Sequence, residues 1–548
     1  MNRTLGNKEC CGNVISGKDE TMQNRKEIVM INVANIYPHP DNPRKDVGDV
    51  TELAESIKKQ GVMQNLTVIP LPALTEEPEE QPDADTESLS SDFHVIIGHR
   101  RLAAAKLAGI EKVPCKIVSK ISKKEQGVCN MYYYKIGDKI CCSFNGNLSY
   151  EKAEMPHPGT PLTFLFEREP GTGRDSFKVN SPLLLFQEAE NVSWLSSRKL
   201  EAQAAKKNCE LDEAVEAAIT QDVMRAVNRL HPDFETILAE KPQKTKKRVH
   251  VLAIGDVGST LLTGLHLLGG DCISSIGICD ISDKVTARWE FEENQIAYPW
   301  AYDVLPEVDV VKPEDLFKCD VFVFVASKGI PPVGSGVKDV RMYQFENNSK
   351  IVAQYARQAR AEHFKGLFAV VSDPVDPLAK TAWLESNKDE NGILDLKGLR
   401  PEQVQGFGLG VMNARAAYYA KRDGRFSQFL TEGRSFGPHG QDLVIADSIE
   451  NYNDELSKEL TQLTVTANLH MRAIGFKPFI APAYSSGAIS LILMMRGEWH
   501  CGSVFMGGIF MGVKNRYTEY GLETEILPLP DALYERIVTA EENLKKIV

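Results

Sequence analysis

The chain has 548 residues, of which 43% are hydrophobic and 25% charged, and its formal net charge at pH 7 is −12. At roughly 150 residues per domain, this length allows about three or four domains. The negative net charge argues against the whole chain acting as a nucleic-acid-binding surface, although a single domain could still do so. No run is long and apolar enough to span a bilayer, and the eleven cysteines lack the spacing of a metal site. These features favour a reduced, cytoplasmic protein with neither a membrane segment nor a metal.

The N-terminal part of the chain predicts a tail and a small domain. Residues 1–27 are polar and mixed in charge, so we expect a disordered tail. Residues 28–122 form the first predicted domain, with a helix over 50–60 and strands over 66–69 and 94–97.

A short motif follows the second of these strands and begins a helix over 102–108. It consists of Gly98, His99, Arg100 and Arg101. The N–H groups at a helix start and two guanidinium groups are the donors that a phosphate needs. The motif therefore predicts either contact with a phosphate-bearing ligand or a retained fold whose arginines pair with nearby acids.

This domain resembles the N-terminal domain of ParB-type chromosome-partitioning proteins. The resemblance rests on residues 36–45, on residues 61–65 and on the Gly98 motif, where the family has Gly-Glu-Arg-Arg. It implies contact with CTP or with DNA phosphates. His99 stands where the family has glutamate, which puts nucleotide hydrolysis in doubt. No recognition-helix pattern precedes Val249, so base readout of DNA is not predicted.

The next two segments have a different character. Residues 131–195 contain short runs of aromatic and apolar residues separated by turns, which predicts a β-rich segment of unknown role. Residues 196–248 have helical periodicity and end in the basic run Lys241–Arg248. A short basic run of this kind is more typical of a solvated linker than of a polyanion site.

Residues 249–405 predict a Rossmann-like, doubly wound parallel sheet. An apolar strand over 249–254 leads through a turn into an apolar helix, and a second strand over 275–279 ends on Asp280. Further strands over 320–325 and 368–372 continue the alternation of strand and helix.

The turn after the first strand is the predicted cofactor site. Small residues there let the backbone approach a pyrophosphate, and an acid at the end of the second strand accepts the ribose hydroxyls. The predicted cofactor-binding residues are Ala253, Gly255, Val257, Gly258 and Asp280. Ala253 stands where the usual G-x-G-x-x-G pattern has its first glycine, and Asp280 favours NAD over NADP.

From Val249 to Val548 the chain resembles the lactate/malate dehydrogenase family. The segments that carry the resemblance stand in family order: Ala253–Thr260, Arg341–Asn348, Ser372-Asp373-Pro374-Val375-Asp376, Gly437-Pro438-His439-Gly440 and Gly507–Val513. The resemblance implies an NAD-binding Rossmann domain over 249–405 and an α+β substrate domain over 406–548. It also implies hydride transfer between NAD(H) and a 2-hydroxy or 2-keto acid, and a homo-oligomer.

The resemblance assigns roles to several of these side chains. The imidazole of His439 would exchange the hydroxyl proton, because imidazoles in general can accept and release a proton near neutral pH. Arg341 would polarise the carbonyl, where negative charge develops. Asn348, at the end of the second segment, would belong to the substrate site.

Three departures from the family affect the predicted substrate site. Asn413 takes the place of the aspartate behind the histidine, and Arg415 falls one residue early for the arginine that holds the substrate carboxylate. Asp373 replaces an asparagine, and its carboxylate would repel an anionic substrate unless it is protonated or paired.

Two functional hypotheses remain open. The first is an NAD-dependent oxidoreductase that resembles lactate/malate dehydrogenases and acts on a small carboxylic acid. The second is a ParB-like nucleotide- or DNA-associated binding protein whose dehydrogenase domain senses NAD(H) with little or no catalysis. We favour the oxidoreductase.

Overall fold

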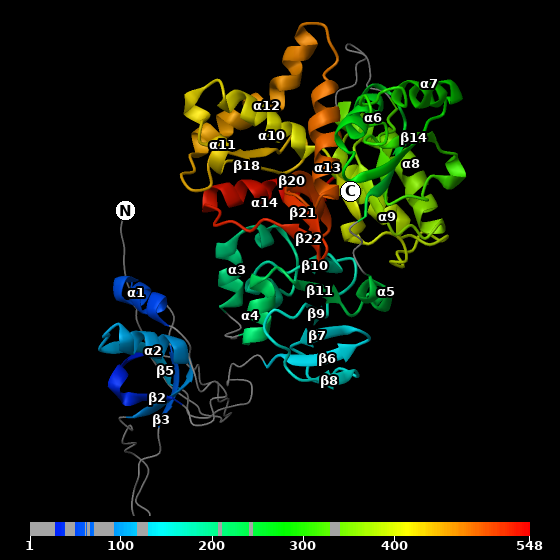
Figure 1. Cartoon of the computed structure of the whole chain (residues 1–548). Helices are drawn as coiled ribbons and strands as arrows, with labels where there is room; N and C mark the ends of the chain where they lie inside the picture. The colour runs from blue at the N-terminus through cyan, green and yellow to red at the C-terminus, as the bar shows by residue number, and fades with distance from the viewer. Residues whose placement is uncertain are drawn as a thin grey trace, which may run out of the picture. The chain divides into compact units, whose positions relative to one another are not determined.

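The computed structural model describes residues 28–38, 50–60, 62, 66–70, 92–117, 130–205, 211–240, 245–328 and 340–548. The predicted tail, 1–27, lies outside these residues. The chain divides into two compact units, Met1–Val128 and Cys129–Val548, which are described separately (Figure 1). In the described part of both units, no helix has the length and apolar character needed to cross a membrane.

The first unit is a mixed five-stranded sheet with two helices. The strand order is β1-β5-β3-β4-β2. The elements are β1 (Ile28–Asn32), β2 (Ile36–Pro38), α1 (Thr51–Gln60), β3 (Leu66–Pro70), β4 (Phe93–Ile97), α2 (His99–Leu107) and β5 (Lys112–Ile117). Ala54 and Ile57 of α1 pack on Ala104 of α2, which holds the two helices together. The small α/β domain predicted from the sequence is therefore present.

The second unit begins with a six-stranded sheet in the order β10-β11-β9-β7-β6-β8. Its strands are β6 (Tyr132–Ile136), β7 (Lys139–Ser143), β8 (Glu151–Ala153), β9 (Leu162–Phe166), β10 (Ser176–Lys178) and β11 (Met224–Asn228). Its helices are α3 (Ser197–Ala204), α4 (Glu213–Thr220) and α5 (Phe234–Ala239).

Strand β11 differs from the sequence prediction, which gave residues 196–248 as helix and linker. This strand lies between β9 and β10, with Ala226 opposite Phe164 and Phe177. Its burial between strands from the preceding segment outweighs the helical periodicity around it. The strands of residues 131–205 and 211–240 therefore belong to one six-stranded sheet.

A nine-stranded sheet forms the rest of the second unit, in the order β14-β13-β12-β15-β16-β17-β20-β21-β22. The first six strands are parallel, as in a doubly wound sheet. They are β12 (Lys247–Leu252), β13 (Ile273–Cys279), β14 (Glu307–Val310), β15 (Val321–Phe324), β16 (Leu367–Val370) and β17 (Val404–Gly406). The predicted Rossmann-like fold is confirmed.

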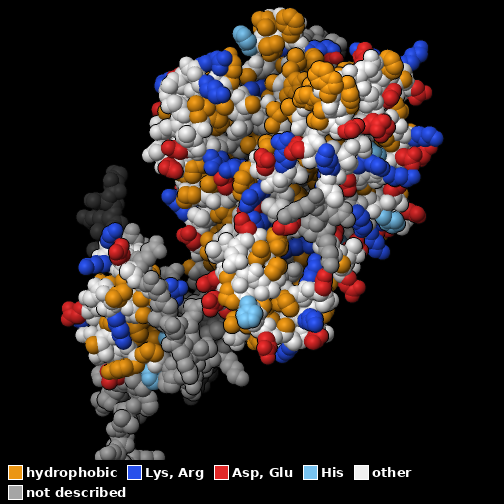
Figure 2. Space-filling view, in the orientation of Figure 1, with side chains coloured by type: hydrophobic (Ala, Val, Ile, Leu, Met, Phe, Trp, Pro, Cys, Tyr) orange, Lys and Arg blue, Asp and Glu red, His pale blue; other side chains and the backbone are white. Residues whose placement is uncertain are grey.

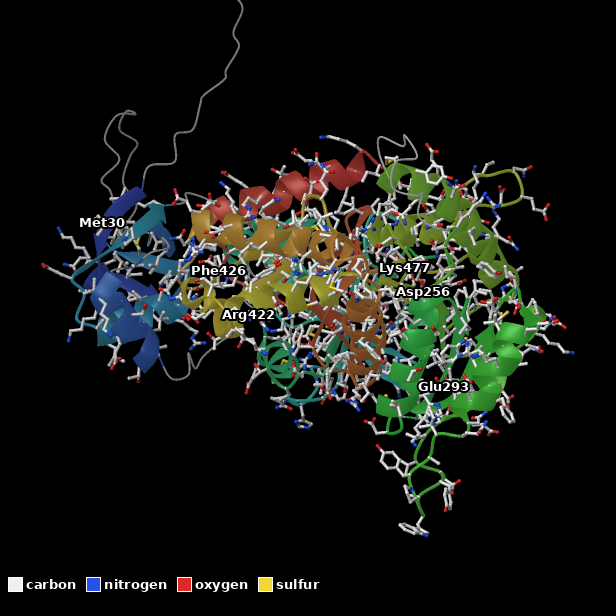
Figure 3. All side chains as sticks on the ribbon, turned by 90° about the horizontal axis from the view of Figure 1, so that it is seen from above. Met30, Asp256, Glu293, Arg422, Phe426 and Lys477 are labelled. Atoms are coloured by element: carbon white, nitrogen blue, oxygen red, sulfur yellow. The ribbon has the colours of Figure 1, made fainter. Side chains whose placement is uncertain are left out.

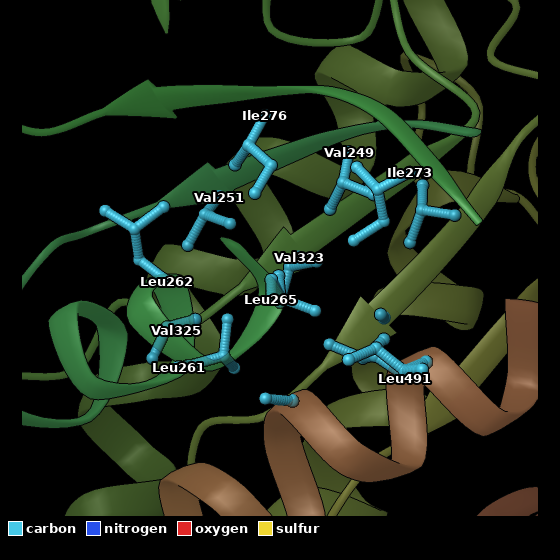
Figure 4. Packing of buried hydrophobic residues seen from close by; sticks show 14 of the residues in the cluster. Val249, Val251, Leu261, Leu262, Leu265, Ile273, Ile276, Val323, Val325 and Leu491 are labelled. Atoms are coloured by element: carbon cyan, nitrogen blue, oxygen red, sulfur yellow. The ribbon is translucent and has the colours of Figure 1, made fainter. Parts of the chain in front are cut away.

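Helices cover both faces of this sheet. On one face, α6 (Asp256–Leu268) and α13 (Ile489–Met495) pack on Val249, Val251 and Ile276 (Figure 4). On the other face, α8 (Val340–Ala361) and α9 (Val375–Ser386) pack on a cluster of phenylalanines that includes Phe322 and Phe368. Helix α7 (Asp283–Glu293) connects β13 to β14. The packing on both sides buries the parallel strands and leaves the loops at their carboxyl ends to form a site.

The C-terminal part is α+β, as predicted. Three antiparallel strands extend the large sheet, and a separate two-stranded ladder lies beside them. The elements are α10 (Leu409–Ala420), α11 (Phe429–Glu432), β18 (Arg434–Phe436), β19 (Val444–Ala446), α12 (Asp454–Ala473), β20 (His500–Met506), β21 (Ile509–Thr518), β22 (Gly521–Thr524) and α14 (Asp531–Lys545).

Exposed hydrophobic side chains gather at the end of α12 and in the loop after it (Figure 2). They are Leu469, Met471, Ile474, Phe476 and Ile480. Exposed apolar clusters of this kind are typical of surfaces that contact other proteins.

Buried charges join the six-stranded sheet to the nine-stranded one. Glu402 accepts hydrogen bonds from the backbone N–H of Asp175 at 3.1 Å and from the Ser176 hydroxyl at 2.8 Å. Asn228 of β11 donates to the Asp175 carboxylate at 2.8 Å. Burial, and then the neighbouring Glu402 carboxylate, raises the pKa of Asp175 to about 7. The junction therefore keeps the Asp175 carboxyl group protonated up to a higher pH than solvent would.

This raised pKa makes stability depend on pH. An aspartate in the unfolded chain titrates near pH 3.9. Between about pH 4 and pH 7 the folded protein therefore binds more protons at Asp175 than the unfolded chain does, and the stability gained at low pH is lost as pH rises. We expect the free energy of unfolding to fall from pH 5 to pH 8 more steeply in the wild type than in Asp175→Asn, by at most about 1.4 kcal/mol per pH unit.

Chemical denaturation followed by tryptophan fluorescence measures this difference. Glu169→Gln, which removes an exposed carboxylate from the same loop, serves as the control. Parallel pH profiles for the wild type and Asp175→Asn would contradict the assignment.

Candidate active site

The turn between β12 and α6 has the geometry of a close backbone approach. Ala253 adopts a φ of +75°, in the left-handed region that favours glycine. A Cβ on Gly258 would lie 2.0 Å from the carbonyl oxygen of Ala253, so helix and turn can approach only because residue 258 is glycine. A Cβ on Gly255 would meet no atom within 4 Å. Val257 packs against the core. The turn is therefore tight on the Gly258 side and open on the Gly255 side.

Asp280 ends β13 beside this turn. Its carboxylate accepts hydrogen bonds from the backbone N–H of Ile254 at 2.8 Å and of Ser282 at 3.1 Å. A carboxylate has about four acceptor positions, so two of them remain for other donors. On α6, Asp256 pairs with Lys477 at 2.8 Å, which ties the loop after α12 to the cofactor turn (Figure 3).

His439 is held by a backbone carbonyl. Its Nδ1 lies 2.7 Å from the carbonyl oxygen of Gly408, and its side chain is 14% exposed. A carbonyl oxygen only accepts hydrogen bonds, so Nδ1 is the donor to Gly408, and in a neutral ring Nε2 is then the nitrogen that carries the lone pair. Nε2 lies 3.9 Å from Oδ1 of Asp373. The imidazole is thus oriented with a basic nitrogen toward the carboxylate.

The loop that carries His439 is fixed by Asp376, a residue to which the sequence assigned no role. Its buried carboxylate accepts the backbone N–H of His439 at 3.2 Å and the hydroxyl of Ser503 at 2.5 Å. The Ser486 hydroxyl donates at 2.6 Å to the same Gly408 carbonyl oxygen that contacts His439 Nδ1, and so helps to fix that oxygen in place. The only sequence signal for Asp376 is its place in the Ser372–Asp376 segment, because its partners are distant in the chain.

Asn413 and Arg415 lie on the same helix, α10, but have different surroundings. Asn413 accepts the Ser435 hydroxyl at 3.1 Å, whereas the hydrogen bond expected from it at His439 is made by Gly408. Burial lowers the pKa of Arg415 and the Asp373 carboxylate raises it. Burial is the larger effect, so the pKa of Arg415 lies below its usual value, and its role at the substrate stays a prediction.

Asn348 joins two loops at the carboxyl end of the sheet. Its side-chain amide donates to the Asp373 carbonyl at 2.7 Å and accepts the backbone N–H of Lys328 at 2.9 Å. Asn348 is buried and fixes the loop after β16 through this contact with the Asp373 backbone, while its predicted role at the substrate stays a prediction. Arg341 lies in the first turn of α8, but its side chain is outside the described residues, so its role stays a prediction.

In the separate N-terminal unit, the Gly98 motif lies at the start of α2. Gly98 is the N-cap with a φ of +102°, and His99, Arg100 and Arg101 form the first turn. A Cβ on Gly98 would lie 3.2 Å from Cγ of Leu66 and 3.6 Å from the guanidinium carbon of Arg101. The glycine therefore lets the first turn of α2 lie close to β3.

Over the described ranges of both units, no group of three His, Cys, Asp or Glu side chains is placed to hold a metal ion.

Comparisons with known proteins agree with the division into two units. Residues 17–132 match the family model of the ParB N-terminal domain. The chain is 30% identical over 105 residues to the probable chromosome-partitioning protein ParB of Vibrio cholerae, a match that covers 19% of this chain and 30% of that protein.

The chain is also similar to two dehydrogenases. It is 28% identical over 185 residues to L-lactate dehydrogenase of Mycoplasma mobile, covering 30% of this chain and 55% of the relative. It is 23% identical over 315 residues to malate dehydrogenase of Aliarcobacter butzleri, covering 55% of this chain and 89% of that relative. A solved structure of malate dehydrogenase from Archaeoglobus fulgidus in complex with NADH aligns with a TM-score of 0.45 at 17% identity, over 55% of this chain and 98% of that one.

The chain thus spans less than a third of the ParB protein and about half of the lactate dehydrogenase. Both resemblances found in the sequence are confirmed: a ParB N-terminal domain precedes a region similar to lactate and malate dehydrogenases.

A pair of glycine substitutions tests the cofactor turn. We expect Gly258→Ala to lower the free energy of unfolding by about 1–3 kcal/mol, because its Cβ would collide with a backbone carbonyl. Gly255→Ala should change it by less than about 0.5 kcal/mol, since its Cβ enters open space. If the cofactor occupies that space, Gly255→Ala should still weaken NADH binding about tenfold. Fluorescence titration measures this, and unchanged affinity would count against the site.

Proposed function

We propose that residues 249–548 form an NAD-dependent oxidoreductase that transfers hydride between NAD(H) and a 2-hydroxy or 2-keto acid. The observation that carries the proposal is the orientation of His439, whose Nδ1 lies 2.7 Å from the Gly408 carbonyl oxygen and whose Nε2 faces Asp373 at 3.9 Å. The similarity to lactate and malate dehydrogenases supports the same chemistry.

The placement of the candidate residues on the sheet gives further support. Ala253, Asp280 and Asp373 follow the carboxyl ends of β12, β13 and β16, which belong to the same parallel sheet. Ligands of doubly wound sheets bind at this edge. The turn proposed to bind the cofactor therefore lies at the same edge of the sheet as Asp373, which His439 faces.

The residues of the turn fit NAD. The open side of the turn at Gly255 and the N-terminus of α6 would hold the pyrophosphate, and the free acceptor positions of Asp280 would take the ribose hydroxyls. The negative charge of Asp280 would repel the additional phosphate of NADP. When bound, NAD accepts the hydride from C2 of a 2-hydroxy acid or, as NADH, returns it to a 2-keto acid.

The chain's own residues would handle the proton and orient the acid. His439 Nε2 accepts the hydroxyl proton as C2 loses hydride, so the products are a 2-keto acid, NADH and an imidazolium. Gly408 keeps its hydrogen bond to Nδ1, and the Asp373 carboxylate at 3.9 Å would stabilise the positive ring. Arg415 would attract the substrate carboxylate. The aspartate that supports the histidine in the family is thus replaced by a carbonyl behind the ring and a carboxylate in front of it.

The second candidate function belongs to the N-terminal unit. We propose that the start of α2 binds the phosphates of CTP or of DNA through Gly98, His99, Arg100 and Arg101. The ParB domain match and the position of Gly98 as the N-cap support this. A protein that only binds nucleotides through this domain and senses NAD(H) through the other would show binding in both units and no turnover.

Removal of the imidazole separates catalysis from cofactor binding. We expect His439→Ala to lower turnover of an accepted 2-hydroxy acid by about 10²–10⁴, the usual contribution of a positioned acid–base group. NADH affinity should change by less than about twofold, which is much less than the tenfold change that ~1.4 kcal/mol of lost binding energy would cause. His470→Ala removes an exposed imidazole from α12 and is the matched control. Wild-type turnover in His439→Ala would disprove the assigned role.

Calorimetry with CTP tests the N-terminal proposal. We expect Arg100→Ala to weaken CTP binding by about 1.5–3 kcal/mol, the contribution of a hydrogen bond to a charged group. Lys58→Ala removes an exposed positive charge from α1 and should leave the affinity unchanged within about twofold. If the wild-type protein binds no CTP, this part of the proposal fails.

A further inference from the structure

Asp373 is held at the reactive face of the candidate histidine. Its backbone carbonyl accepts the buried Asn348 amide at 2.7 Å, which fixes the loop after β16. Its carboxylate is 52% exposed, and Oδ1 lies 3.9 Å from Nε2 of His439. A substrate whose hydroxyl reaches Nε2 must therefore place its neighbouring atoms close to this carboxylate.

The charge of Asp373 acts on the group that would hold the substrate. The carboxylate raises the pKa of Arg415, while burial of the guanidinium lowers it. The two side chains thus interact electrostatically and carry opposite charges before any substrate binds. One substrate carboxylate would be attracted by Arg415, but a second one near Asp373 would meet a like charge.

A donor group on the substrate would have the opposite effect. An ammonium or hydroxyl group next to the reacting carbon could donate to the exposed Asp373 carboxylate. Hydrogen bonds to a charged acceptor are shorter and stronger than neutral ones. In a substrate with an ammonium group, the carboxylate would face Arg415 and the ammonium group would face Asp373. The pairing of charges in the site therefore favours a zwitterion over a dicarboxylate.

We propose that Asp373 is a specificity-determining residue that selects 2-hydroxy acids with a hydrogen-bond donor on C3, an ammonium group above all, and rejects those with a carboxylate there. This inference rests on the proposed oxidoreductase function and names its substrate class.

Four acids that differ only at C3 test the selection. Lactate carries a hydrogen at this position, glycerate a hydroxyl, isoserine (3-amino-2-hydroxypropanoate) an ammonium and malate a carboxylate. Both enantiomers of each are assayed with NAD by the appearance of NADH. We expect kcat/KM to be highest for isoserine, followed by glycerate and then lactate, with malate at least tenfold below isoserine.

Substitution of the carboxylate should change this order. Because loss of the carboxylate beside His439 would also slow turnover of every acid, the readout is the ratio of kcat/KM for isoserine to that for malate, which Asp373→Asn should lower at least tenfold. Asp373→Ser, a smaller neutral variant, should give the same change and guards against a folding defect in the first. Glu314→Gln, which removes an exposed carboxylate from the loop after β14, should preserve the wild-type order.

The outcomes distinguish this inference from the proposed function. Turnover with lactate or malate preferred, or an order that survives both Asp373 variants, would overturn the selection and leave the oxidoreductase in place. If no acid is oxidised, calorimetric binding of the four acids to the NAD-loaded protein gives the comparison. The expected order in binding would support Asp373 while the oxidoreductase fails, and binding of malate at least equal to isoserine, or of none of the four, would refute the selection.

Discussion

The hydrogen bond from His439 Nδ1 to the carbonyl oxygen of Gly408 is the contact on which the candidate active site depends. It fixes the tautomer of the ring, and it is possible because Gly408 has no side chain. A Cβ there would lie 3.0 Å from Cβ of His439 and 2.9 Å from Cγ2 of Val375. Asp376 holds the histidine backbone from the other side. Three segments distant in sequence, those of Asp376, Gly408 and His439, therefore converge to orient the imidazole.

The same physical device would serve both candidate phosphate sites. In each unit a glycine precedes a helix whose first turn offers N–H groups, Gly98 before α2 and Gly255 before α6. The units differ in what surrounds the helix start. Arginines follow Gly98, whereas an acid at the end of the next strand, Asp280, lies beside the turn in the dehydrogenase-like unit. The two proposed sites thus differ in the charge of the side chains around the helix start: positive at the proposed nucleotide or DNA contact and negative at the proposed NAD site.

The parts of the fold that local sequence determines could be predicted, and the parts that depend on distant contacts could not. The unit from β12 to Asp280 has its hydrophobic periodicity and its turn within about thirty residues, a single βαβ unit, so the sequence predicts it. Strand β11 was not predicted, because its partners lie in a segment far earlier in the chain. The Gly408 carbonyl and Asp376 were missed for the same reason. The sequence placed Asn413 behind the histidine, but the backbone makes that contact instead.

Whether residues 249–548 are an oxidoreductase can be decided by a fluorescence titration of the full chain with NADH, followed by addition of a panel of 2-keto acids while NADH absorbance is recorded. We expect saturable NADH binding and a loss of absorbance with at least one acid, because the turn at Gly255 and the loop of Asp373, which His439 faces, both follow carboxyl ends of strands in the same parallel sheet. NADH binding without oxidation by any acid would contradict the oxidoreductase and favour a protein that senses NAD(H).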